Sequence, residues 1–221
     1  MRVELPRRPR RPATLLVMVA LMLASCARDK SYALTVTSKT QTTLIFFTDE
    51  NMRDSEWSDL FDALHKALQR EGRQIPALGQ GAEFLRGDRI ASGLEASQPI
   101  SVYLHGDCSL VPMLRTSAMG ALGWVRRVRG RIEPFIHVDC AQIALELGPF
   151  ALGMNRNRRD MVMSEAMARV VLHEWVHVAT QSPGHTKRGV EKAQFDAADL
   201  LVEDEEIQRH PQILRRRWND L

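Results

Sequence analysis

The sequence predicts an α+β domain in which a mixed, twisted sheet packs on one long buried helix, with a further helix at the C-terminus. β-branched and aromatic runs, typical of strands, occupy residues 42–48, 100–104, 122–128 and 132–138. Runs with apolar residues at helical spacing occupy residues 55–71, 160–181 and 190–208. The order is therefore strand, helix, strand, hairpin and then the long helix, which fits an α+β domain.

The first two elements have clear boundaries. Residues 42–48, Thr-Thr-Leu-Ile-Phe-Phe-Thr, predict a buried strand. The helix at 55–71 ends at Gly72. Its apolar positions at helical spacing are Trp57, Leu60, Phe61, Leu64 and Leu68. Residues 73–97 are rich in glycine and support no assignment.

Residues 122–128 and 132–138 predict a β-hairpin. The segment 120–125, which contains Gly123 and Trp124, is the candidate edge strand of the sheet. Free N–H and C=O groups on such an edge can pair with an extended peptide. An ordinary edge strand, protected by the neighbouring arginines, fits the same residues equally well.

The long helix at 160–181 contains no Gly or Pro, and Asp160 or Ser164 is the candidate residue that caps its start. Ser182-Pro183-Gly184 follows and is typical of a helix end. Most faces of this helix are apolar, so we expect it to be buried.

His173 and His177 lie four residues apart on this helix, which places both imidazoles on one face. Two neutral imidazoles at this spacing are typical ligands of one Zn²⁺ ion. Glu174 follows the first histidine and is the candidate general base for a water at the metal. The alternative is a core helix with two satisfied histidines and a capped glutamate. Three buried polar side chains so arranged favour a shared partner.

A catalytic zinc site needs a third protein ligand as well as an open position. His185 is the first candidate, because a positive φ at Gly184 would turn the chain back beneath the metal. Glu191 is the second candidate, since it offers a carboxylate near the start of the last helix. More distant acidic candidates are Asp196, Asp199 and Glu203.

The segment from His173 to His185 resembles the zincin metallopeptidases, and within them the metzincin branch. This resemblance implies zinc bound by His173, His177 and His185, with Glu174 as base, and a mixed sheet lying on the active-site helix. The chain departs from the branch in two features. Its third histidine follows the second by eight residues, whereas metzincins space them by about six. No methionine for a downstream methionine turn follows Met167.

The first residues predict export. Residues 1–12 carry five arginines and residues 13–23 are apolar, the pattern of a secretory signal. Leu-Ala-Ser before Cys26 resembles a bacterial lipobox, which implies cleavage before Cys26 and lipidation of its thiol. We therefore expect a signal peptide at 1–25, a tether at 26–40 and a zincin-like catalytic domain at 41–221. Ala27 favours the periplasmic face of the outer membrane if the host is Gram-negative; an uncleaved anchor is the alternative.

Charge and cysteine content narrow the function further. The first 25 residues hold five Arg and one Glu, so without them the formal net charge falls from +3 to −1. This composition gives no indication of a nucleic-acid surface. Cys108 and Cys140 are the two cysteines left beside Cys26, and an exported protein can join them in a disulfide.

These observations predict a zinc-dependent endopeptidase, anchored by lipid at the bacterial cell envelope, whose partner is a peptide or protein substrate. The alternative is a zinc-binding lipoprotein without turnover that acts as a scaffold or binding module. A third possibility is an envelope protein in which the motif is fortuitous. The sequence does not indicate an oligomeric state.

Overall fold

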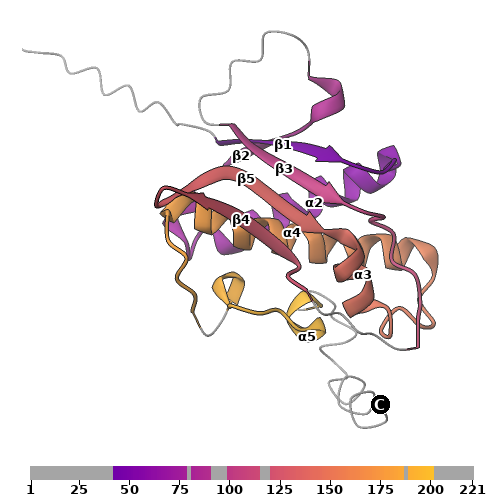
Figure 1. The fold of residues 1–221 in the computed structure, drawn as a ribbon. Coiled ribbons are helices and arrows are strands. Elements are labelled where there is room, and N and C mark those ends of the chain that lie inside the picture. Colours follow the sequence, from indigo (N-terminus) through magenta and orange to yellow (C-terminus); the bar gives the residue numbers. More distant parts are fainter. Residues whose placement is uncertain (1–41, 79–80, 91–98, 115–119, 187–188, 202–221) are drawn as a thin grey trace, which may run out of the picture. The chain divides into compact units, whose positions relative to one another are not determined.

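The computed structural model describes residues 42–78, 81–90, 99–114, 120–186 and 189–201. The predicted signal peptide, the lipidation site Cys26 and the tether lie outside these ranges. Figure 1 shows the strands in one layer, with α2 and α4 beneath it. No helix within the described ranges is long and apolar enough to cross a membrane.

The sheet is mixed, as predicted. Its strands are β1 Thr42–Thr48, β2 Ala82–Arg86, β3 Pro99–His105, β4 Gly123–Val128 and β5 Arg131–Asp139. They lie in the order β2-β1-β3-β5-β4, and only β4 runs antiparallel to its neighbour. Arg129 and Gly130 have positive φ angles of 52° and 86° and turn the chain between β4 and β5. The predicted hairpin is therefore confirmed, and β4 is an edge strand.

One helix organises the packing. The helices are α2 Asp54–Glu71, α3 Cys140–Leu147, α4 Arg156–Thr180 and α5 Ala197–Leu200. α4 packs against α2, α3, β4 and β5. Its Met167, Val171 and Trp175 are fully buried in the same cluster as Val102 and Ile136 of the sheet. Alternate strand residues point to this helix layer, which explains the spacing of the apolar positions. The result agrees with the predicted α+β class.

The start of the long helix differs from the prediction. Asn155 caps α4 by accepting a hydrogen bond from Arg158 N at 2.9 Å. Asp160 and Ser164 are both inside the helix. The Asp160 carboxylate instead forms an ion pair with Arg53 at 2.8 Å, and Ser164 is buried. The two predicted caps lie five and nine residues after Asn155, so both are inside the helix rather than at its start.

Three other elements were missed or wrong. Within the unassigned glycine-rich region, β2 pairs in parallel with β1. α3 follows β5 directly and is capped by Asp139, which accepts from Gln142 N at 3.0 Å. The last helix does not run from residue 190. A 3₁₀ turn, η4 Gly189–Glu191, comes first, and α5 begins only after Asp196, whose side chain accepts from Asp199 N. Residues beyond 201 of that predicted helix lie outside the described ranges.

The sheet face opposite α4 carries a row of stacked rings. Phe47, Tyr103, His137 and Trp124 come from four adjacent strands, with ring centroids 5.1–5.3 Å apart and interplanar angles of 6–19°. His105 extends the row, because its Nε2 lies 2.9 Å from His137 Nδ1. Its Nδ1 donates to the Asp49 carboxylate at 2.9 Å. Cross-strand ring pairs of this kind stabilise a sheet, here at its β4 edge.

The two cysteines paired from the sequence form a disulfide, with an S–S distance of 2.04 Å. Cys108 follows β3 and Cys140 begins α3, so the bond ties the start of α3 to the segment that leaves the sheet. Cys140 is fully buried.

Replacing His137 by Gln is expected to make the stability of the metal-free protein less dependent on pH. Burial lowers the pKa of His137, and the nearby His105 charge acts in the same direction. The unfolded chain then binds a proton more readily, so stability is lost as pH falls below about 6.5. Urea unfolding at several pH values between about 5 and 7 measures the slope. The His65→Gln variant, which removes an exposed histidine, is the matched control. Equal slopes in His137→Gln and wild type would contradict this prediction.

Candidate metal centre

The two histidines and the glutamate of the motif are buried on α4 among apolar residues. His173, Glu174 and His177 are 7%, 5% and 6% exposed. Burying such groups costs free energy unless each finds a partner. The predicted spacing is confirmed, since the two imidazoles lie on one helix face with ring centroids 4.7 Å apart.

His185 completes a group of three imidazoles. His177 Nε2 lies 3.2 Å from His173 Nε2 and 3.1 Å from His185 Nε2. Ligand nitrogens of a tetrahedral zinc ion, each about 2.0–2.1 Å from the metal, are about 3.3 Å apart. All three nitrogens lie within 4.8 Å of one another, so they could hold one metal ion. Two of the histidines are buried and His185 is exposed.

Backbone carbonyls fix the tautomers of the two buried histidines. His173 Nδ1 donates to Val190 O at 2.6 Å, and His177 Nδ1 donates to Ser182 O at 2.7 Å. A carbonyl oxygen only accepts, so each Nδ1 carries its hydrogen and each neutral ring has a lone pair on Nε2. Burial lowers the pKa of His173 to about 4, which keeps this ring neutral at pH 7. Where both rings are neutral, their Nε2 lone pairs face one another at 3.2 Å and repel, and a cation between them would remove the repulsion.

The turn after α4 brings His185 back to the helix. Gln181, with φ 53° and ψ 26°, is the left-handed residue that ends α4. Gly184 does not have a positive φ, so the predicted role of this glycine was wrong. The Gln181 side chain exchanges two 3.0 Å hydrogen bonds with the backbone of Ile132, its Oε1 accepting from N and its Nε2 donating to O. These bonds hold the end of α4 against β5, and they explain why the left-handed position needs no glycine.

Glu191 does not join the three histidines. Its backbone oxygen accepts from Thr186 N at 2.9 Å, which places the preceding Val190 carbonyl over His173. Of the acidic alternatives, Asp196 caps α5 and Asp199 pairs with Lys192. Glu203 lies outside the described ranges.

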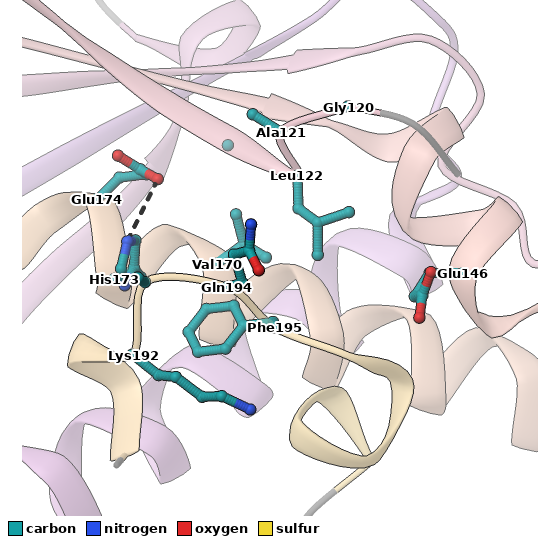
Figure 2. A pocket seen from close by; sticks show the side chains of 12 residues that line it. Gly120, Ala121, Leu122, Glu146, Val170, His173, Glu174, Lys192, Gln194 and Phe195 are labelled. Carbon is teal, nitrogen blue, oxygen red and sulfur yellow. Dashed lines mark ion pairs between the residues drawn. The ribbon is translucent and has the colours of Figure 1, made fainter. Parts of the chain in front are cut away.

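Glu174 lies at the side of the imidazole group that faces a cleft. Its Oε1 is 3.9 Å from His173 Nε2 (Figure 2). Burial raises the pKa of Glu174 to about 7. A cation held by the imidazoles would act in the opposite direction and favour the carboxylate.

Gly123 allows the edge strand to lie directly on Glu174. A Cβ at this position would be 3.1 Å from Glu174 Cγ and 2.6 Å from Val170 Cγ1. Every other residue type therefore pushes β4 away from α4. Trp124, the next residue, points to the opposite face and stacks on His137. The candidate edge residues are thus brought to the site, Gly123 beside Glu174 and Trp124 behind the strand.

A cleft of about 530 Å³ runs beside this edge, within the usual range of ligand sites. Its lining includes the backbone of Gly120, Ala121, Leu122 and Gly123, with Glu146, Val170, His173, Glu174 and the segment 192–195. Phe195 contacts the His173 ring edge to face, with centroids 5.2 Å apart. Phe195, Glu146 and Gln181 had no sequence pattern that linked them to the histidines.

Replacing His185 by Ala is expected to lower zinc affinity by about 100-fold or more, because it removes one of three ligands. His185 is exposed, so the substitution should leave the fold intact, which circular dichroism checks. Competition with a chromophoric chelator measures the affinity. Glu191→Ala is the control and should bind zinc as the wild type does. Unchanged affinity in His185→Ala together with a loss in Glu191→Ala would reverse the ligand assignment.

Replacing Gly123 by Ala is expected to destabilise the fold by about 1–3 kcal/mol, the usual cost of overpacking. The atoms nearest to the added methyl group belong to Val170, Glu174 and the His137 carbonyl, so zinc affinity should stay within a few-fold of wild type. Urea unfolding and zinc titration measure the two effects. Gly81→Ala is the matched control, since a Cβ there meets nothing within 4 Å. Equal stability of both variants would show that β4 does not press on α4.

The chain matches no protein-family model, no curated protein and no solved structure. The function must therefore be inferred from the geometry of this site.

Proposed function

We propose that this protein is a zinc-dependent endopeptidase. One observation carries the proposal: three imidazole nitrogens converge beside a buried carboxylate, and this group opens on a cleft along the edge of a sheet. A structural zinc site is usually closed by four protein ligands, whereas a catalytic site has three and keeps one position open. The group of three histidines has the second composition.

Neutral imidazoles suit zinc better than calcium or magnesium, which prefer oxygen ligands. The carbonyls of Val190 and Ser182 hold His173 and His177 with Nε2 toward the metal position. When bound, Zn²⁺ supplies Lewis-acid polarisation of the scissile carbonyl and lowers the pKa of an attacking water.

Glu174 is the general base in this proposal. It takes the proton of the attacking water and then gives it to the leaving amine. Its position beside His173 puts the carboxylate within reach of a water at the metal position.

The β4 edge is the proposed substrate-binding strand. Among the described strands β4 has one neighbour, β5, so its outer backbone groups remain available to an extended peptide. Leu122 O is already used by Asp139 N at 2.9 Å. Backbone groups alternate in direction along an antiparallel strand, so those of Gly123 point away from β5. A peptide paired there would pass directly over Glu174.

The resemblance to zincins supports the same function, since a mixed sheet lies on the helix with both motif histidines. We also propose that the protein is exported and anchored by lipid at Cys26. The Cys108–Cys140 disulfide supports this location, because such bonds persist in oxidising compartments outside the cytoplasm.

A zinc-binding lipoprotein without turnover is the second candidate. It is favoured by the position of Tyr103, which stacks between Phe47 and His137 on the sheet face opposite Glu174. The described side chains that line the cleft include no tyrosine or arginine to stabilise an oxyanion.

Replacing Glu174 by Gln separates the two candidates. For an endopeptidase, the variant should keep one zinc ion per chain but cleave a peptide library at least about 100-fold more slowly, because only the general base is lost. Metal analysis and mass spectrometry of the products measure both. Glu83→Gln, an exposed change on β2, is the control. Zinc-loaded wild type that cleaves nothing would favour the second candidate.

A further inference from the structure

Glu146 is a carboxylate of the cleft that takes no part in the proposed chemistry. It belongs to α3, and Figure 2 shows it across the cleft from His173 and Glu174. One of its oxygens accepts from Ala197 N at 3.1 Å. Among the described residues no Lys or Arg forms an ion pair with it. Burial raises the pKa of Glu146; the Ala197 N–H lowers it and the charge of Asp196 raises it again.

Two basic side chains near the cleft have other partners. Lys192 Nζ pairs with Asp199 and lies 3.8 Å from an Asp196 oxygen. The Arg169 guanidinium lies over the Phe195 ring, 5.7 Å from its centroid. Glu146 is thus a partly buried carboxylate that forms no ion pair with the described basic residues. A positively charged group in the cleft would offset the cost of burying it.

Apolar walls connect Glu146 with the metal centre. Figure 2 shows Leu122, Val170 and Phe195 between His173 and Glu146. Val170 precedes His173 by three residues, so it lies nearly one helical turn, about 5 Å, along α4 toward Glu146. The cleft thus offers apolar walls that lead to a charged group. Lysine and arginine side chains match this arrangement, because they have an apolar stem and a charged end and bury the stem along apolar surfaces.

We propose that this cleft selects a peptide with a long basic side chain, lysine or arginine, beside the scissile bond, and that Glu146 binds its charged end. This inference rests on the proposed function and names its substrate class. The stem lies against Leu122, Val170 and Phe195 while the backbone pairs with β4. An uncharged side chain of equal length gains the apolar contact but leaves Glu146 without a cation. An acidic side chain is repelled by Glu146 and Asp196.

The test compares three peptide series that differ at one position, which carries lysine, norleucine or glutamate. Each position around the cleaved bond is varied in turn, and kcat/KM is measured with zinc-loaded protein. At one position the wild type should prefer lysine over norleucine by about 10-fold or more. Glu146→Gln, which keeps an acceptor for Ala197 N–H, should lose this preference. Glu146→Lys should favour glutamate. Glu83→Gln is the control and should keep the wild-type preference.

A binding measurement makes the result independent of turnover. Fluorescence anisotropy with the zinc-loaded Glu174→Gln variant compares the lysine and norleucine peptides, with and without the added Glu146→Gln change. If the lysine peptide binds more tightly than the norleucine peptide, and Glu146→Gln removes this difference, the inference is supported. This holds even if the wild type cleaves no peptide, because absence of cleavage overturns only the proposed endopeptidase activity. Cleavage or binding without a basic preference at any position overturns the inference and leaves the endopeptidase intact. No binding of any peptide also overturns it.

Discussion

The repulsion between imidazole lone pairs on α4 is the constraint on which the rest of the site depends. His173 and His177 are 7% and 6% exposed on a largely apolar helix, so little solvent is available to satisfy them. Their Nδ1 atoms are bound to the backbone, which leaves Nε2 of both rings for a metal, and His177 Nε2 lies 3.2 Å from His173 Nε2 and 3.1 Å from His185 Nε2. The turn through Gln181 brings His185 to the two helix histidines, and the Val190 carbonyl in η4 holds the His173 ring by its Nδ1. A cation held by the three imidazoles would remove this repulsion.

The edge strand is held from both faces. On the inner face Gly123 rests against Glu174, and on the outer face Trp124 stacks on His137 in the row of rings. A strand at the edge of a sheet has neighbours on one side only and is otherwise the least restrained. Here packing on both faces of β4 fixes the distance between this strand and the Glu174 carboxylate. The position of the proposed substrate backbone is therefore fixed by the sheet as much as by α4.

The sequence predicted the parts of this molecule that depend on local spacing. β1, the hairpin and α4 follow from alternation and helical periodicity, and the two motif histidines share a face because helix geometry requires it. β2 and α3 were missed because each is short and is stabilised by tertiary contacts, β2 by β1 and α3 by its disulfide. The last helix was predicted to start several residues before its actual start. The acidic residues near 196 were interpreted as the polar face of a continuous helix, whereas Asp196 caps a new helix, α5.

The difference between local and tertiary contacts also separates the residues of the proposed reaction from those of the proposed substrate recognition. His173, Glu174 and His177 lie within about one turn of one helix, so a five-residue motif is enough to predict that their side chains lie close together. Glu146 and Phe195 are brought to the cleft from different elements, α3 and the segment before α5. α3 begins at Cys140, so the disulfide to Cys108 also helps to fix where Glu146 lies relative to the sheet. The proposed reaction type therefore follows from local sequence, whereas the proposed selectivity depends on contacts that only the folded chain makes.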